Sequence, residues 1–82
     1  NREGMELLTR ELTARGLGVT PSQTNFLLVD FRRDASELFP ELLRRGVIVR
    51  PMGPYGLGHC ARVTVGLSDE NSRFLAALDE VL

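Results

Sequence analysis

Two arginines flank one glycine- and proline-rich loop in the second half of the chain. The stretch 47–66, VIVRPMGPYGLGHCARVTVG, places Arg50 at the end of one β-like run and Arg62 near the start of the next. A guanidinium held on a strand donates two parallel hydrogen bonds to a carboxylate or a phosphate. The spacing therefore indicates a site for a small anion. An internal ion pair, or a charge that protects an edge strand, is the alternative that the spacing leaves open.

The other reactive side chains do not form a pattern that is typical of catalysis or metal binding. His59 is the only histidine and Cys60 the only cysteine. Consecutive residues of a strand point to opposite faces, so we do not expect a cysteine–histidine pair. A metal site needs several such ligands at suitable spacing, which the sequence lacks. The GPYGLG stretch, 53–58, precedes a strand and not a helix, which is unlike a phosphate-binding loop.

Composition excludes several classes of function. The 82 residues amount to one domain or a piece of one, and the net charge of −1 favours neither nucleic acid nor an anionic membrane as a partner. The chain has no apolar run of the roughly 20 residues that a membrane helix needs. A lone cysteine fits a reducing compartment, so we expect a cytoplasmic location. All ten basic residues are arginine, so no side chain can form a lysine Schiff base.

The hydropathy pattern predicts elements in the order α-β-α-β-β-α. Helices are predicted over 2–15, 34–46 and 68–82, and strands over 25–31, 47–50 and 61–66. The run 25–31 is almost wholly apolar, which favours a central strand covered on both faces. A helical crossover would make it parallel to 47–50, while 61–66 could pair antiparallel through the loop. We therefore expect an α+β fold, a two-layer sandwich with helices packed on one face of a small mixed sheet.

Turn and cap residues mark where these elements end. Residues 19–24, VTPSQT, predict a turn that short polar side chains stabilise. Asp34 or Ser36 is expected to cap the second helix, and Ser68 the third. The first helix starts at the beginning of the chain without a clear cap, which favours a cut inside a longer protein.

Several segments together resemble the C-terminal small domain of histidinol-phosphate aminotransferases. These segments are PSQTNFLLVDF, ELLRRGVIVRP, YGL and RVTVGLSDENSRFLAALDEVL, in this order from about Pro21 to the C-terminus. Histidinol-phosphate aminotransferases are class I/II, fold-type I enzymes that use pyridoxal phosphate. The resemblance implies that residues 1–82 are the C-terminal small domain of such an enzyme, without its large cofactor-binding domain.

The resemblance also implies roles for individual residues. In this family the arginine of the R-[VI]-T-[VI]-G strand, here Arg62, holds the anionic end of the substrate. The arginine that closes the preceding strand, here Arg50, assists it. Asn25, in the family's NF pair, is placed near the substrate entrance. The catalytic lysine and the cofactor-binding residues belong to the large domain, so none is expected in this chain.

The implied reaction converts histidinol phosphate and 2-oxoglutarate into imidazole acetol phosphate and glutamate. The parent enzyme is then expected to bind pyridoxal phosphate, to be a homodimer and to have no nucleic-acid or membrane partner. This chain alone is not expected to be an enzyme, because it has no lysine to hold the cofactor. Two alternatives stay open. One is the small domain of a related enzyme, such as threonine-phosphate decarboxylase or an aromatic aminotransferase; the other is a free-standing regulatory module that binds a small anion.

Overall fold

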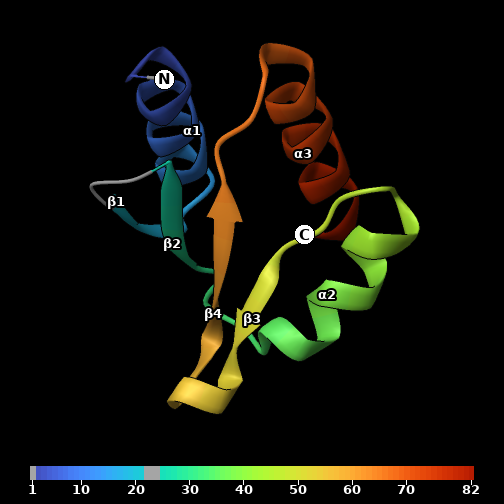
Figure 1. Ribbon diagram of the computed structural model, residues 1–82. Coiled ribbons are helices and arrows are strands. Elements are labelled where there is room, and N and C mark those ends of the chain that lie inside the picture. The colour runs from blue at the N-terminus through green and yellow to red at the C-terminus, as the bar shows by residue number, and fades with distance from the viewer. Residues whose placement is uncertain (1, 22–24) are drawn as a thin grey trace.

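The computed structural model describes residues 2–21 and 25–82, and within these ranges three helices pack on a four-stranded sheet (Figure 1). The elements are α1 (Arg2–Ala14), β1 (Gly18–Pro21), β2 (Phe26–Asp30), α2 (Ala35–Arg44), β3 (Arg50–Met52), the 3₁₀ turn η1 (Gly53–Tyr55), β4 (Leu57–Thr64) and α3 (Ser68–Val81). The predicted α+β order is confirmed, with β1 as an additional strand. The predicted strand 47–50 is displaced, because residues 47–49 lie outside any strand and Arg50 begins β3 and does not close the strand before it. The first part of the predicted turn at 19–24 belongs to β1, and residues 22–24 lie outside the described residues.

The sheet has the strand order β1-β2-β4-β3, and every neighbouring pair is antiparallel. The predicted mixed sheet is therefore wrong, because the strands expected at 25–31 and 47–50 are not neighbours. β2 and β3 do run in the same direction, because each is antiparallel to β4. The crossover through α2 leaves room for one strand between them, and β4 occupies that place.

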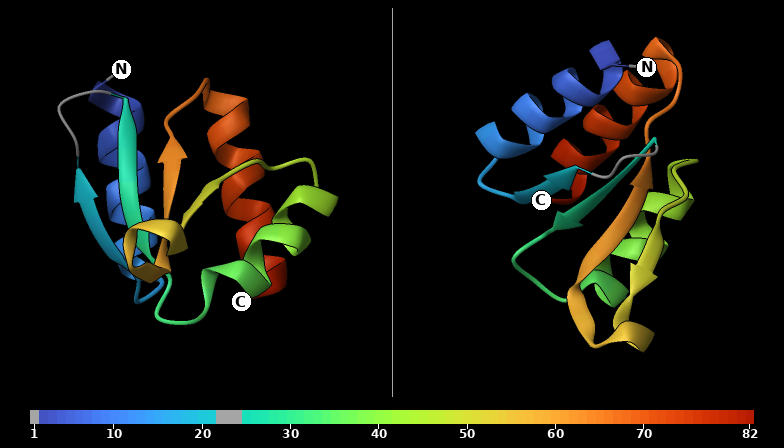
Figure 2. Two further views of the ribbon diagram at one scale, coloured as in Figure 1. Left: turned by 60° about the horizontal axis from the view of Figure 1, so that its bottom comes forward. Right: turned by 60° about the vertical axis from the view of Figure 1, so that its left-hand side comes forward.

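Alternation of side chains gives the sheet one covered face and one open face. The buried positions on the covered face are Leu27, Val29, Ala61 and Val63. In the left view of Figure 2, α1 and α3 lie behind the strands, and buried residues of all three helices belong to one core. Phe26 and Leu28 point away from this core and are half-buried. The expectation that 25–31 is covered on both faces is therefore wrong for this chain.

We call the uncovered side of the sheet the open face. Its members follow from the strand register, since residues opposite each other in an antiparallel pair share a face. On β2, β3 and β4 they are Phe26, Leu28, Asp30, Arg50, Cys60, Arg62 and Thr64. These side chains range from half-buried to exposed.

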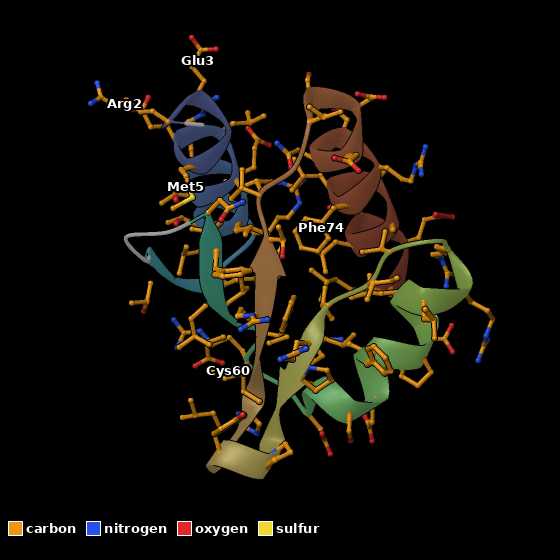
Figure 3. All side chains as sticks on the ribbon, in the orientation of Figure 1. Arg2, Glu3, Met5, Cys60 and Phe74 are labelled. Atoms are coloured by element: carbon orange, nitrogen blue, oxygen red, sulfur yellow. The ribbon has the colours of Figure 1, made fainter. Side chains whose placement is uncertain are left out.

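Each helix contributes leucine or phenylalanine side chains, four residues apart, to one core beneath the covered face. The buried residues of these helical stripes are Leu8, Leu12, Leu38, Leu42, Phe74 and Leu78. Figure 3 shows the ring of Phe74 between α3 and β4. Burial of each such side chain contributes about 1.5–3 kcal/mol, which holds short helices that would not be stable alone. In the described part of the chain, no helix has the length and apolar character needed to cross a membrane.

The connection from β4 to α3 is held by side chains that reach back from the helix. The predicted cap Ser68 is instead the first helical residue, and Leu67 occupies the cap position. The carboxylate of Glu70 accepts the backbone N–H of Leu67 at 2.7 Å. The buried amide of Asn71 accepts the N–H of Gly66 at 2.9 Å and donates to its carbonyl at 3.1 Å. These bonds replace the expected serine cap.

The caps of α2 agree better with the sequence. Asp34 is the N-cap, and its Oδ1 accepts both the backbone N–H and the hydroxyl of Ser36, at 2.9 and 2.7 Å. Of the two predicted candidates, Asp34 is therefore the one that caps. Ser36 serves as its donor.

The ends of α1 and α2 repeat one sequence and one geometry. Residues 11–19 read ELTARGLGV and residues 41–49 read ELLRRGVIV. In both copies the glycine has a left-handed φ of 81°, and the residue after it donates its N–H to the carbonyl of the leucine five residues earlier. Glycine adopts this conformation at little cost, so each copy turns the chain from a helix toward the sheet.

The arginines of this repeat connect both helices to the end of α3. Arg15 donates to Asp79 through Nε and Nη2, at 2.6 and 2.8 Å, and to the carbonyl of Glu11 at 2.8 Å. Arg45 lies 3.6 Å from Glu80, measured from Nε to Oε2. Two consecutive acids of α3 thus receive one arginine each, which fixes the three helices relative to one another.

The pair Arg15–Asp79 predicts a pH dependence of stability. The hydrogen bond from Arg15 lowers the pKa of Asp79. A carboxylate whose folded pKa is depressed contributes stability above its unfolded pKa of about 4, and the contribution is lost as pH falls through the folded value. We expect Arg15→Met to lower stability at neutral pH and to make the loss below about pH 4 shallower.

Urea unfolding of the 82-residue chain between neutral and acidic pH, followed by circular dichroism, measures this effect. Arg10→Met is the matched control, because Arg10 is exposed and its Nε lies 3.9 Å from Glu11. Parallel pH profiles for the wild type and Arg15→Met would contradict the prediction.

Candidate functional site

The strand register brings the two predicted arginines directly opposite each other on the open face. Arg50, the first residue of β3, is the Cα partner of Arg62 on β4. Opposite Cα atoms in an antiparallel pair are about 4.5–5.5 Å apart, and the two side chains share a face. Two like charges in this arrangement destabilise a sheet unless a negative charge compensates them.

No acid of the described residues compensates this pair. The ion pairs within 2–21 and 25–82 join residues of the helices or lie next to them, and they include neither Arg50 nor Arg62. Asp30 is on the same face, two positions along β2 from the partner of Arg62. Its Oδ1 accepts the backbone N–H of Arg32 at 2.9 Å. The guanidinium donors of both arginines are therefore available to an external anion.

The two arginines differ in how firmly they are held. Arg62 is half-buried, and its guanidinium carbon lies 4.2 Å from the centroid of the Phe26 ring. Such a cation–π contact contributes about 0.5–1 kcal/mol at an exposed site and more when it is desolvated. Arg50 is exposed. Arg62 is thus the more firmly ordered member of the pair.

Asn25, the third predicted site residue, lies outside the strand pairing that joins the two arginines. It precedes β2, its side chain is exposed, and its carbonyl accepts the N–H of Val65 at 2.8 Å. It is three residues before Leu28, the partner of Arg62 in the register. The structure therefore brings Arg50 and Arg62 together but shows no contact of either with Asn25, so the role of Asn25 near the substrate stays a prediction.

The remaining reactive groups do not form a second site. Cys60 is a half-buried residue near the lower part of β4, and Asp30 is its partner in the register (Figure 3). Burial, together with the charge of Asp30, raises the pKa of the Cys60 thiol, which keeps it protonated at neutral pH. His59 is exposed. Among the described side chains, no three histidine, cysteine or acidic groups are close enough to hold a metal ion.

Phe26 is the residue of this site that the sequence pattern did not reveal. An apolar run suggests a buried strand, so each of its members was expected to pack in a core. The contact could be predicted only from two residues taken together, an aromatic residue in one strand and an arginine at a diagonal position of the neighbouring strand. This combination becomes visible only once the pairing of β2 with β4 is known.

Residues 2–78 match the family described as Aminotransferase class I and II. The chain belongs to this family. Over 82 residues it is 48% identical to histidinol-phosphate aminotransferase 2 of Pasteurella multocida (strain Pm70). Over 84 residues it is 50% identical to the histidinol-phosphate aminotransferase of Desulfotalea psychrophila (strain LSv54 / DSM 12343). Both alignments cover 100% of this chain and 22% of the relative, so the chain spans about a fifth of the length of these enzymes.

The fold of this aminotransferase chain is shared with a protein of different chemistry. A decarboxylase from Sulfurospirillum multivorans superposes with a TM-score of 0.84 at 28% identity, over 98% of this chain and 24% of that one. The likeness extends over the same elements that carry the two arginines. The fold alone therefore does not select the reaction.

Aminotransferases of class I and II depend on pyridoxal phosphate. A lysine amine is the group that forms a Schiff base with this cofactor, and none of the 82 residues is lysine. The open face presents arginines instead. The residues of this aminotransferase chain thus do not fit a site that holds the cofactor covalently.

Proposed function

We propose that residues 1–82 form the C-terminal small domain of a pyridoxal-phosphate-dependent transaminase, in which Arg62 and Arg50 bind the anionic group of the substrate. The observation that carries this proposal is the pair of arginines at opposite register positions without an acidic partner among the described side chains. An anion between them turns a repulsive arrangement into one with several charge-assisted hydrogen bonds. Such bonds are about twice as strong as neutral ones.

The proposed substrate is histidinol phosphate, with 2-oxoglutarate as the amino-group acceptor. Identities of 48% and 50% to histidinol-phosphate aminotransferases over the whole chain support this choice. Two guanidiniums suit a phosphate, which offers three acceptor oxygens and up to two negative charges. In the other half of the reaction, the same pair can bind a carboxylate of glutamate or 2-oxoglutarate.

The chain's contribution in this proposal is binding and orientation. Arg62 fixes the position of the anionic end, and Arg50 adds charge from an exposed side chain. Holding one end of the substrate places the amine for reaction and reduces the entropy that the reaction must otherwise overcome. In this proposal the large domain of the parent protein holds the cofactor. The large domain packs against the open face of the sheet, opposite the helices. The half-buried Phe26 and Leu28 on this face support such a contact.

The parent protein is further proposed to be a cytoplasmic homodimer without nucleic-acid or membrane partners. A net charge of −1 supports the lack of an electrostatic attraction to either polyanion. The lone cysteine, whose thiol is protonated, suits a reducing compartment.

The likeness to a decarboxylase supports one alternative function, that of threonine-phosphate decarboxylase. That enzyme would also need a phosphate site, so the opposed arginines alone do not distinguish it. The products do, because decarboxylation releases carbon dioxide and transamination does not.

Assays on the intact protein encoded by the parent gene test the proposal. We expect transfer of the amino group from histidinol phosphate to 2-oxoglutarate with kcat/KM about 100-fold or more above that for phenylalanine. Release of carbon dioxide from threonine phosphate would assign the alternative. A complete reading frame of about this length, without a lysine-bearing domain, would contradict the proposal and favour a free-standing anion-binding module.

A further inference from the structure

The aromatic ring of Phe26 covers one face of the Arg62 guanidinium, with 4.2 Å between the guanidinium carbon and the ring centroid. We propose that Phe26 is a positioning residue, which sets the plane of Arg62 so that its edge N–H groups meet the substrate anion. This inference rests on the proposed function of Arg62 and adds a second residue to it.

The register places both a ring and an acid near Arg62, and the contact is with the ring. Its direct partner on β2 is Leu28, and its two diagonal neighbours there are Phe26 and Asp30. Within the described residues, Asp30 forms no ion pair with Arg62, and its Oδ1 accepts the N–H of Arg32. Arg62 is therefore held by the neighbour that does not neutralise its charge.

A ring and an acid would have opposite consequences for anion binding. A carboxylate would occupy the N–H groups of Arg62 and compete with the substrate. A ring contacts the π face of the guanidinium and leaves its five N–H donors, which all lie in the guanidinium plane, accessible from the edge. Phe26 thus orders Arg62 without reducing its capacity to bind a phosphate or a carboxylate.

The ordering of the Arg62 side chain by Phe26 should increase the affinity of the site for its anion. An exposed arginine loses side-chain entropy when it binds a ligand, and a side chain that is already ordered loses less. Arg50 is exposed and Arg62 is half-buried against the ring. The two guanidiniums therefore contribute differently, since Arg62 fixes the orientation of the anion and Arg50 supplies additional charge.

Three variants of the intact, cofactor-loaded enzyme test this inference. Phe26→Leu removes the ring but keeps an apolar side chain, and Phe26→Tyr keeps the ring. Phe31→Leu is the matched control, since Phe31 is 1% exposed and belongs to the core beneath the covered face. The readouts are a phosphorus NMR titration with inorganic phosphate, KM and kcat for histidinol phosphate, and the thermal midpoint.

We expect Phe26→Leu to raise the dissociation constant of inorganic phosphate about threefold to tenfold, the range that a cation–π contact supports. KM should rise by a similar factor, with kcat changed by less than about twofold, because binding and not the chemical step is affected. Phe26→Tyr should restore both constants to within about twofold of the wild type. Phe31→Leu should lower the thermal midpoint and leave the phosphate constant unchanged.

The remaining outcomes separate this inference from the function on which it rests. If Phe26→Leu binds phosphate like the wild type while Arg62→Ala binds it more weakly, positioning by Phe26 is wrong and the proposed function stands. If Arg62→Ala also binds phosphate normally, the proposed function fails as well. If Phe31→Leu weakens phosphate binding as much as Phe26→Leu does, the role of Phe26 is structural and the inference is overturned.

Discussion

Replacing Arg62 by alanine in the intact parent protein should, under the proposed function, raise KM for a phosphate-bearing substrate about tenfold to a hundredfold. Hydrogen bonds to charged groups contribute about 1.5–3 kcal/mol each when they are shielded from water, and alanine removes every donor of this side chain. Arg62 is half-buried, stacked on Phe26 and without an acidic partner among the described residues. Most of its binding capacity is thus reserved for the ligand.

Steady-state kinetics and the absorbance of the bound cofactor check this prediction together. The absorbance should not change, since this chain has no lysine to hold the cofactor. Arg62→Lys should give an intermediate KM, because an ammonium keeps the charge but lacks the planar fork of donors. Arg73→Ala, at an exposed position of α3, is the control with normal kinetics. An unaltered KM in Arg62→Ala would refute the assignment of the anion site.

Replacing Asn71 by alanine should destabilise the 82-residue chain by about 2–4 kcal/mol, from two lost hydrogen bonds and a small cavity. Asn71 is only 4% exposed, and its amide forms both hydrogen bonds with the backbone of Gly66. It therefore joins the end of β4 to the first turn of α3. Alanine cannot make this connection, because its methyl group neither donates nor accepts a hydrogen bond.

Urea unfolding measures the loss of unfolding free energy in Asn71→Ala. The midpoint concentration should fall, while the dependence of the free energy on urea concentration should not change. Ser72→Ala is the matched control, because Ser72 is the next residue of the same helix and is exposed; its effect should stay within about 0.5 kcal/mol. Asn71→Asp should also destabilise, because a carboxylate can accept the N–H of Gly66 but cannot donate to its carbonyl. Equal midpoints for Asn71→Ala and Ser72→Ala would disprove this role of Asn71.

The sequence by itself determined the features that depend on local patterns. The three helices follow from apolar residues at helical spacing, and each predicted helix agrees with the structure to within two residues at its ends. The aspartate cap of α2 follows from local hydrogen bonding. The alternation in β4, with Val63 on one face and Arg62 and Thr64 on the other, follows from the period of a strand. These signals need no knowledge of distant partners.

The proximity of the two arginines was also open to prediction, because one hairpin loop joins their strands. Arg50 and Arg62 are only 12 positions apart in the sequence, and the structure pairs them. The hairpin of β3 and β4 does not by itself reveal which of its two strands pairs with β2. The sequence pattern favoured a parallel neighbour for 25–31, and the hairpin instead inserts β4 beside β2.

Only the tertiary structure decided the surroundings of the site. The pairing of β2 with β4 joins residues from 30 to 38 positions apart, and such a register depends on the packing of the whole sheet on the helices. That pairing leaves one face of β2 open and brings Phe26 against Arg62. The structure also shows β1 as an additional strand beside β2. The use of Glu70 and Asn71, not Ser68, at the start of α3 is by contrast a local feature, since these bonds span only three and five residues. Long-range pairing therefore placed Arg62 against a ring, and within the described residues neither Arg62 nor Arg50 forms an ion pair with an acid.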